Sequence, residues 1–462
     1  MIDNKFELYK YINNNIKPKQ KEKQEYGEVF TPLNIIEQLF ENLDKKYKEI
    51  NNNSIFEEVN FKWGDVNGSG IGNFSIVIYF KLMDGLKNII INENERKKHI
   101  LENMIYMAEY NINNIEICKK IFESNEYKLN LFHGDALTLN INKEWGIDKF
   151  DVIVGNPPFN KGGIKSCSGK YLNKNGEKNI TVWPRFVKKS FENLKEEGFL
   201  ILIHPLSWLK KCHSIHNVLL EKYIIYLKLW DNAQSKICIN GEIPLSVYIL
   251  QNINNLTELK TKVITELKRY SCYNTSLVYL DKNISIPLGC FNIYNKLSKF
   301  IDKYKCKLDI NTKTVRSNGI QQQLPDNYDI KDKWGIDTYR LRDGIIVKKL
   351  IEKHPDIDKR KIIIANKTDI IGHFIDEGKI GLTGNHKYYI LGDNLELIKK
   401  ILSFKFCRII TIFLKYRQQF LEIEVFNYIP DLRKMDIIDI EEDEFYKLVG
   451  FDENEIKYIY QI

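Results

Sequence analysis

The amino-acid sequence predicts an α/β protein whose first half is built around a mainly parallel sheet and whose second half is a mixed α+β domain. Between residues 61 and about 210, short apolar runs alternate with amphipathic segments. This alternation is typical of parallel strands joined by crossover helices. Beyond about residue 255 the alternation weakens, and strand-like and helical runs are separated by Gly- and Asp-rich turns. We therefore expect a charged lead-in over 1–25, a first domain over 26–255 and a second domain over 256–462.

The bulk composition is that of a mildly basic globular protein. The chain has 462 residues, enough for two or three domains. Its 43% hydrophobic and 28% charged residues exclude a disordered or fibrous chain. The net charge of +8 suits a polyanionic partner, because cationic side chains displace condensed counterions from phosphate backbones.

Targeting and metal-binding patterns are not found in the sequence. The first 21 residues are polar and Lys-rich, without the apolar core of a signal peptide. No stretch approaches the roughly 18 consecutive apolar residues that a membrane span needs. The scattered cysteines form no Cys-x-x-Cys pair and the histidines no His-Glu-x-x-His cluster. We therefore expect a soluble cytoplasmic protein that holds no metal.

The first helix is expected to begin at Thr31 and Pro32. Threonine is a good N-cap residue, and proline is favoured at the first helical position. Apolar residues then recur at helical spacing and give one apolar face: Ile35, Ile36, Leu39, Phe40 and Leu43. The Lys- and Asn-rich stretch 45–54 ends this helix.

The elements that follow are predicted from the same alternation. Strands are expected at 105–108, 129–132, 150–154 and 198–203, with helices at 112–122 and 182–194. The Gly-, Lys-, Asn- and Ser-rich segment 160–181 interrupts the alternation and is predicted to be a loop. In the second half, strands are expected at 361–365 and 388–391, and a helix at 395–406.

The most informative motif is Asn156-Pro157-Pro158-Phe159, which directly follows the apolar run 150–154. Two prolines fix the backbone and remove donors, so the preceding carbonyls stay available as acceptors. The Asn side-chain oxygen is a second acceptor beside them. An aromatic ring at a rigid offset can stack on a flat base. Two acceptors and a ring form a pocket for an exocyclic amine, in which the nitrogen becomes nucleophilic.

This motif resembles that of the amino-group DNA methyltransferases, in the gamma-type branch where the cofactor domain comes first and the target-recognition domain follows. The resemblance extends from about Gly27 to about Arg433 and is strong to Leu209. It implies a Rossmann-like S-adenosylmethionine-dependent methyltransferase domain followed by a mixed α+β target-recognition domain. It also implies that Asn156 and the Pro157 carbonyl bind the target amine and that Phe159 stacks on a flipped-out base.

Upstream segments occur in the order of that family. The segment 26–32 is similar to the opening motif, in which the Thr-Pro helix start lines the methionine end of the cofactor. The segment 65–74 is similar to the Gly-rich cofactor loop, 105–111 to the strand whose acidic end takes the ribose hydroxyls, and 132–136 to the motif that binds the cofactor adenine. The cofactor-binding residues implied by the resemblance are Phe30, Thr31, Pro32, Asp65, Gly68, Gly70, Glu109, Asp135, Ala136 and Asn156.

The Gly-rich loop departs from the family pattern. Val66 and Asn67 stand where the family usually has Pro and Ala, and the stretch to Phe74 is one residue longer. The register of the glycines is therefore open. Because of this departure, the alternative of a DNA-binding protein with a decayed cofactor site is also open.

The implied reaction is direct displacement, in which the adenine N6 nitrogen attacks the sulfonium methyl group. The target base must leave the duplex first, because its amine is held inside the base pair. The amine loses its proton after it has become positively charged, so no strong general base is required. The loop 160–181 is expected to close over the flipped base.

The expected partner is double-stranded DNA, bound by a monomer. Adenine is implied by the family branch alone, because no residue that reads the base can be identified in the sequence. Basic residues of the second half that could contact phosphates are Lys348, Lys349, Lys359, Arg360, Lys361, Arg408, Lys415 and Arg417. Whether a separate cognate restriction endonuclease is a partner is open.

Three alternatives are also open. The same motif serves methylation of cytosine amines, of RNA guanine amines and of glutamine side chains. A single-chain restriction enzyme would need a carboxylate cluster, which Asp369 with Glu377-Gly378-Lys379 resembles loosely. The third alternative is the decayed-site DNA-binding protein. His204 ends a predicted strand and is given no chemical role.

Overall fold

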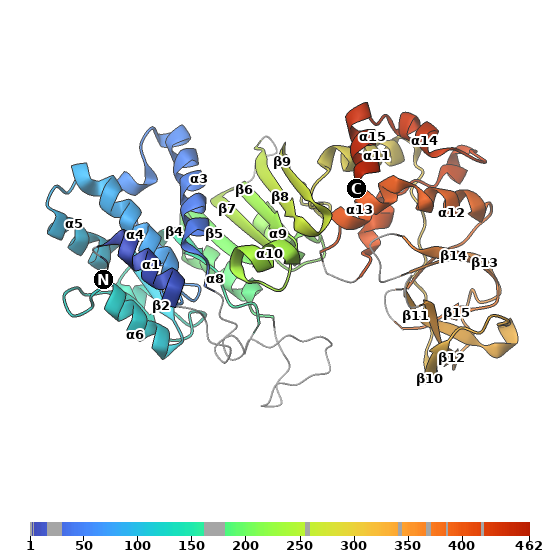
Figure 1. Ribbon diagram of the computed structural model, residues 1–462, viewed down its shortest axis with the longest axis horizontal. Coiled ribbons are helices and arrows are strands. Elements are labelled where there is room, and N and C mark those ends of the chain that lie inside the picture. Colours follow the sequence, from blue (N-terminus) through green and yellow to red (C-terminus); the bar gives the residue numbers. More distant parts are fainter. Residues whose placement is uncertain are drawn as a thin grey trace. The chain divides into compact units, whose positions relative to one another are not determined.

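The chain folds into two compact units, Met1–Ile284 and Ser285–Ile462, in the computed structural model (Figure 1). The structure describes Ile2 and residues 4–15, 30–160, 181–254, 259–340, 344–365, 371–384, 387–416 and 420–462. The division lies later than the boundary expected after residue 255, because strands β8 (Thr261–Leu267) and β9 (Cys272–Val278) extend the sheet of the first unit.

The first unit is built on a nine-stranded sheet in the order β3-β2-β1-β4-β5-β7-β6-β8-β9. Strands β1 to β5 are parallel to one another, whereas β7 runs antiparallel to both β5 and β6. Strand β1 lies between β2 and β4, so the strand order reverses there. Ligands of open α/β sheets bind at such a reversal, outside the carboxyl ends of the strands. The remaining bounds are β1 Trp63–Asp65, β2 Ile105–Glu109, β3 Asn130–His133, β4 Phe150–Gly155, β5 Leu194–Pro205, β6 Lys222–Trp230 and β7 Leu245–Asn254.

The predicted strands of this unit correspond to β2, β3, β4 and β5, and the two predicted crossover helices are α6 (Ile112–Ile121) and α8 (Trp183–Asn193). The predicted α/β fold with a mainly parallel sheet is therefore confirmed. The other helices of the unit are α1 Lys5–Asn15, α3 Leu33–Asn51, α4 Asn73–Gly85, α5 Glu93–His99, α7 Ile141–Trp145, α9 His216–Leu220 and α10 Asn232–Ile239.

The start of α3 differs from the sequence prediction. The helix begins at Leu33 with Pro32 in the N-cap position, and no side chain caps it. The expectation that Thr31 would be the cap was wrong, because its hydroxyl is bonded elsewhere, to the side chain of Asn156.

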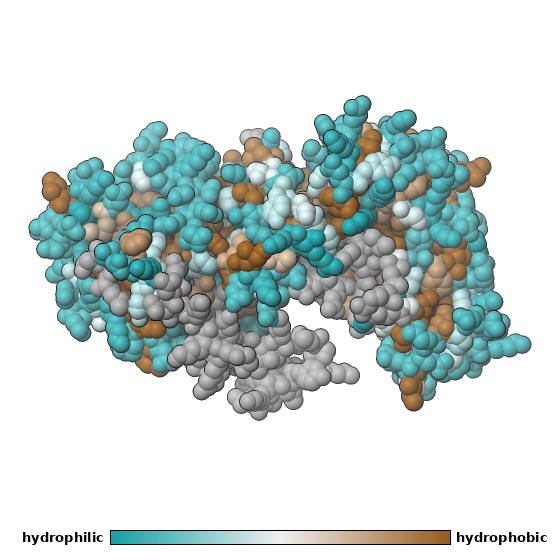
Figure 2. All heavy atoms as spheres, viewed as in Figure 1, coloured by the Kyte–Doolittle hydropathy of each residue, from teal (hydrophilic) through white to brown (hydrophobic). Residues whose placement is uncertain are grey.

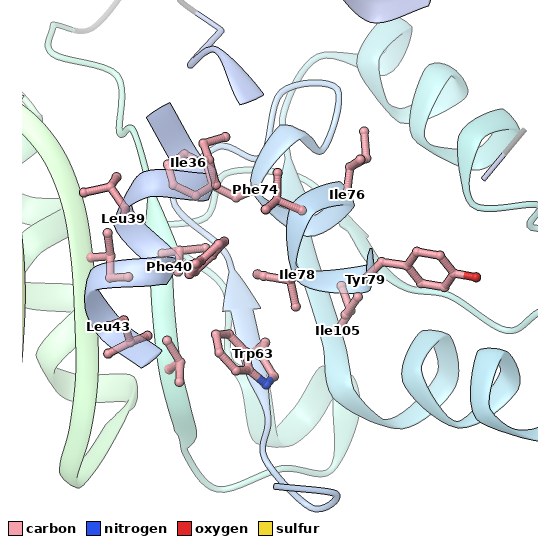
Figure 3. Close-up of a cluster of buried hydrophobic side chains, with 14 of the residues drawn as sticks. Ile36, Leu39, Phe40, Leu43, Trp63, Phe74, Ile76, Ile78, Tyr79 and Ile105 are labelled. Atoms are coloured by element: carbon pink, nitrogen blue, oxygen red, sulfur yellow. The ribbon is translucent and has the colours of Figure 1, made fainter. Parts of the chain in front are cut away.

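The apolar face of α3 was predicted correctly and packs on β1 and α4 (Figure 3). Ile36, Phe40 and Leu43 are fully buried, and the Phe40 ring meets the Trp63 ring of β1 edge-on at 5.9 Å. Burial of a large apolar side chain contributes about 1.5–3 kcal/mol. This packing fixes the position of α3, and with it that of the residues just before the helix.

The second unit contains two small sheets and several helices. A four-stranded sheet has the order β10-β12-β11-β15, and a three-stranded sheet has the order β14-β13-β16. The strands are β10 Ser317–Gln323, β11 Trp334–Arg340, β12 Gly344–Leu350, β13 Arg360–Ile364, β14 His373–Glu377, β15 Gly381–Leu382 and β16 Tyr388–Ile390. The longer helices are α11 Phe291–Tyr304, α12 Leu395–Ser403, α13 Lys405–Phe413, α14 Glu442–Val449 and α15 Glu453–Gln461. The mixed α+β prediction is confirmed, and β13, β16 and α12 lie where strands and a helix were expected.

A buried ion pair in the second unit corrects one sequence expectation. Lys361 of β13 and Asp376 of β14 are both fully buried, with 2.6 Å between Nζ and the carboxylate. Lys361 therefore holds the small sheet together and is not available to a phosphate. Of the other basic residues named for that role, Arg360 pairs with Glu377 at 3.0 Å and Arg417 lies outside the described residues.

Hydrophilic residues cover most of the described surface in the view of Figure 2. Exposed apolar residues are scattered, which is normal for a globular protein. Among the helices within the described ranges, none has the length and apolarity to cross a bilayer.

Candidate active site

Three predicted site residues meet at one edge of the nine-stranded sheet. Asp65 is the last residue of β1 and Glu109 the last of β2, while Asn156 directly follows β4. These strands are adjacent and parallel, with Asp65 opposite Met107 and Gly64 opposite Ile153. Their carboxyl ends therefore lie side by side at the reversal of strand order.

The Gly-rich loop connects the elements of this edge. Gly68, Gly70 and Gly72 all have positive φ angles, of 92°, 58° and 84°. A Cβ atom added at Gly70 would lie 3.0 Å from Cε1 of Phe30, and one added at Gly68 would lie 3.7 Å from Cδ of Pro158. Glycine is needed where the backbone is left-handed and closely approached. Glycine occupies every second position from Gly68 to Gly72, and Gly72 is the N-cap of α4.

Glu109 is held by the backbone at both carboxylate oxygens. The Gly70 amide donates to Oε2 and the Asn111 amide to Oε1, each at 2.7 Å. Burial raises the pKa of Glu109, while the backbone hydrogen bonds from Asn111 and Gly70 lower it. Each carboxylate oxygen can accept a further hydrogen bond, so this fixed group suits a pair of ribose hydroxyls.

Asp65 is nearly inaccessible to solvent, with 1% of its surface exposed. Ser75 Oγ donates to its Oδ2 at 3.0 Å, whereas its Oδ1 has no hydrogen-bond partner among the described residues. Desolvation by burial raises the pKa of Asp65 to about 7, and the hydrogen bonds from Ser75 oppose this.

Further buried polar atoms without a partner within the described ranges lie on the loop and just after β2. They are Ser69 Oγ, Asn73 Oδ1 and Asn111 Nδ2. Buried polar groups are almost always hydrogen-bonded in native proteins. The oxygens of Asp65, Ser69 and Asn73 can accept hydrogen bonds from a polar ligand. The Ser69 hydroxyl can also donate one, and Asn111 Nδ2 is a donor. This set fits S-adenosylmethionine, which carries an ammonium group, a carboxylate and ribose hydroxyls.

Asp135 and Ala136 lie just beyond the end of β3. Glu109 at the end of β2 faces His133 of β3, and its carbonyl accepts from the Gly134 amide at 3.0 Å. The exposed Asp135 accepts from the Leu137 amide through Oδ1 at 2.9 Å. These residues therefore extend the same edge by one strand beyond Glu109.

The Asn156-Pro157-Pro158-Phe159 motif faces the residues before α3. Nδ2 of Asn156 donates to Oγ1 of Thr31 at 3.4 Å. Phe159 is half-buried, and its carbonyl accepts from the Val182 amide at 3.0 Å. Residues 161–180, which make up most of the loop expected to close over the base, lie outside the described residues.

Sequence reasoning assigned no role to Asn67, which ties the Gly-rich loop to the end of β4, just before Asn156. Its Nδ2 donates to the carbonyl of Val154 at 3.4 Å, and its Oδ1 accepts from Ser190 Oγ of α8 at 3.2 Å. A methyl group at Gly155 would lie 2.8 Å from Cβ of Asn67. The signal was present in the sequence, because Asn67 is one of the two residues that depart from the family pattern.

His204 has a structural position, as the sequence indicated. It is fully buried, its ring stacks on Trp183 with centroids 4.3 Å apart, and Nε2 lies 3.1 Å from the Tyr248 hydroxyl. Burial lowers the pKa of His204 to about 3, so the ring is neutral at physiological pH.

The loose nuclease pattern gains no support from the second unit. Asp369 lies outside the described residues, and the Glu377 carboxylate is paired with Arg360 at 3.0 Å. In the described part of the chain, no three His, Cys, Asp or Glu side chains are grouped so that they could hold a metal ion.

The raised pKa of Asp65 predicts a pH dependence of stability in the ligand-free protein. Its folded-state pKa of about 7 lies above the ordinary value of 3.8, so the folded protein binds the extra proton between these values. Stability should therefore fall as pH rises through this window, with a slope approaching about 1.4 kcal/mol per pH unit, and level off above it. Urea unfolding of wild type and Asp65→Asn across this range measures the difference, because asparagine does not titrate. Parallel curves for the two proteins would refute the assignment.

The comparisons with known proteins concern the family resemblance and the fold. The family model described as Eco57I restriction-modification methylase matches residues 80–236, which include β2, β3, β4 and the Asn156 motif. The expected resemblance to this kind of methyltransferase is thus confirmed. The Gly-rich loop and Thr31 lie outside the matched segment. No curated protein matches the chain.

Solved structures share the fold at low sequence identity. The type IIL restriction-modification enzyme MmeI in complex with DNA has a TM-score of 0.52 at 10% identity, covering 91% of this chain and 70% of that one. A DrdV–DNA complex has a TM-score of 0.50 at 12% identity, covering 92% of this chain and 57% of that one. A nuclease-deletion mutant of the type ISP enzyme LlaGI has a TM-score of 0.50 at 11% identity, covering 87% of this chain and 46% of that one. This chain thus spans little more than half the length of the DrdV chain.

Proposed function

We propose that this chain, whose residues 80–236 match the Eco57I restriction-modification methylase family, is a DNA methyltransferase that uses S-adenosylmethionine and methylates the N6 amino group of adenine. The observation that carries the proposal is the contact between the Gly-rich loop and the catalytic turn. Gly68 approaches Pro158, and Asn67 is hydrogen-bonded to the carbonyl of Val154. A methyl group bound at the loop would therefore lie next to an amine bound at the turn.

The residues that would hold the cofactor come from four segments. Glu109 would accept the ribose hydroxyls, and Asp65 would receive a cationic or hydroxyl donor at Oδ1, which has no partner among the residues that the structure describes. Asp135 with Ala136 would border the cofactor adenine. Phe30 with Pro32, Gly68 and Gly70 would line the methionine end. When bound, the cofactor supplies an electrophilic sulfonium methyl group.

The residues of the catalytic turn would bind and activate the target amine. Asn156 Oδ1 and the Pro157 carbonyl would accept its two hydrogens and direct the nitrogen lone pair toward the methyl group. Pro158 fixes the turn and Phe159 would stack on the base, which offsets part of the few kcal/mol that unstacking costs. No carboxylate or imidazole is needed at the turn, because the amine becomes acidic once it is methylated.

The second unit is the proposed target-recognition domain for double-stranded DNA. The net charge of +8 favours a polyanionic partner over a protein side chain. Adenine is preferred over cytosine N4 or an RNA base because of the family branch. In this proposal the protein acts as a monomer in the cytoplasm, with a separate cognate restriction endonuclease as a partner.

Transfer of a labelled methyl group from S-adenosylmethionine into unmethylated DNA, followed by mass spectrometry of the nucleosides, tests the proposal. Label in N6-methyladenine is the expected result. Label in N4-methylcytosine would keep the reaction and overturn the base. Label in RNA alone would overturn the acceptor, and no transfer to DNA or RNA would contradict the proposed enzyme.

A further inference from the structure

Thr31 makes two hydrogen bonds that join the two halves of the candidate active site. Its side-chain Oγ1 accepts from Nδ2 of Asn156 at 3.4 Å, on the catalytic turn. Its backbone carbonyl accepts from Nδ2 of Asn73 at 2.8 Å, where the Gly-rich loop becomes α4. Only 3% of Thr31 is exposed, so neither bond is exchanged freely with water.

The local structure indicates that the threonine hydroxyl is committed to Asn156. Threonine before a helix normally caps the first backbone amides. Here α3 has no side-chain cap, and Pro32 takes the N-cap position instead. The helix is held by its apolar face against Trp63, so it does not need the cap.

The direction of the bond between Thr31 and Asn156 has a chemical consequence. The side-chain amide of asparagine is planar, with an acceptor oxygen and a donor NH2 group that point in different directions within that plane. When Nδ2 donates to Thr31, Oδ1 is directed to the opposite side. In the reversed orientation, the NH2 group of Asn156 would face the NH2 group of the target base. Two donors cannot form a hydrogen bond, so the target amine would not be bound.

We propose that Thr31 is a positioning residue that holds the side-chain amide of Asn156 in place, in the orientation whose oxygen can accept from the target amine, and links it, through Asn73, to the Gly-rich loop. This inference rests on the proposed function and gives Thr31 a role beyond lining the cofactor. Through Asn73 and Asn156, Thr31 is a second link between the Gly-rich loop and the turn, besides the one that Asn67 makes with Val154.

Thr31→Val tests the proposal, because valine has nearly the same shape and lacks the hydroxyl. Thr31→Ser restores the hydroxyl and is the rescue variant. Thr261→Val is the matched control: Thr261 is also 3% exposed, and its Oγ1 donates to the carbonyl of Ile224 on β6. All three variants are compared with wild type by circular dichroism and urea unfolding, so that a folding defect is recognised.

The first readout does not depend on activity. In protein labelled with ¹⁵N at asparagine, the side-chain amide signal of Asn156 is assigned by its loss in Asn156→Ala. This signal should shift and exchange faster in Thr31→Val, and keep its wild-type behaviour in Thr31→Ser and Thr261→Val. An unchanged signal in Thr31→Val would overturn the proposal, whether or not the protein transfers methyl groups.

The second readout is kinetic. Thr31→Val should lower kcat roughly tenfold, the effect of one neutral hydrogen bond, and change the Kd of S-adenosylmethionine by a smaller factor than kcat. Thr31→Ser should recover most of that loss. A higher Kd for the cofactor with unchanged kcat would overturn the proposal and make Thr31 a cofactor contact. Equal losses in Thr31→Val and Thr261→Val would identify a merely structural role. A wild-type protein that transfers no methyl group would contradict the proposed function, while the amide signal still decides the role of Thr31.

Discussion

Asn156→Ala is expected to reduce methyl transfer by at least about 10²- to 10³-fold, the usual cost of removing a side chain that stabilises developing charge at a reacting atom. The substitution removes the acceptor that holds the target amine and leaves the prolines of the turn in place. Asn156 follows β4 directly and its side chain lies on Thr31, outside the packed core. We therefore expect the variant to fold, and saturating cofactor separates the loss of transfer from any weakening of cofactor binding.

Single-turnover transfer with saturating cofactor measures this loss. Asn142→Ala is the matched control, because Asn142 is an exposed asparagine on α7, a helix to which no site residue is assigned. Retention of more than a tenth of wild-type activity in Asn156→Ala would show that the amine is held elsewhere.

Asp376→Asn is expected to destabilise the second unit by about 3–5 kcal/mol, because it leaves the Lys361 cation buried without its partner. The Lys361 ammonium is also bonded to the carbonyls of Ile357 and Lys359, at 3.3 and 3.0 Å. Burial lowers the pKa of Lys361, and the hydrogen bond to Asp376 opposes this effect. Without the carboxylate, the lysine must lose its proton or draw water into the sheet.

Urea unfolding of the full chain measures the destabilisation. Glu377→Gln is the control, since Glu377 pairs with Arg360 on the surface and such pairs contribute at most about 1 kcal/mol. Adding Lys361→Met to Asp376→Asn should recover part of the loss, because the uncompensated charge is then gone. Equal effects of Asp376→Asn and Glu377→Gln would contradict the account of the buried pair.

The parts of the fold that the sequence predicted are those with strong local patterns. Strands β2, β4 and β5 could be predicted because buried parallel strands are continuous apolar runs. Helix α3 could be predicted because its buried face repeats apolar residues at helical spacing. The site residues at the ends of β1, β2 and β4 were implied by the resemblance to the methyltransferase family, and β1 itself was not among the predicted strands. The parallel pairing of β1 with β2 and β4 brings the carboxyl ends of these strands together.

The parts that were missed depend on contacts between distant residues. Thr31 resembles a helix cap because the sequence does not reveal that its hydroxyl meets Asn156, far along the chain. Lys361 resembles a surface cation because its partner Asp376 lies on another strand. The boundary after residue 255 was placed too early because β8 and β9 pair with the sheet only through long-range registers. Asn67 was noticed as a departure, but its bonds to Val154 and Ser190 come from tertiary structure.

The most direct test of the central claim is calorimetric titration of S-adenosylmethionine into wild type and Glu109→Gln. The account predicts one binding site in wild type and an affinity about 10- to 100-fold weaker in the variant, because hydrogen bonds to a charged acceptor are lost. Equal binding to both proteins would contradict a cofactor site at the ends of β1, β2 and β4. No binding to wild type would contradict it as well, and would favour a DNA-binding protein whose cofactor site has decayed.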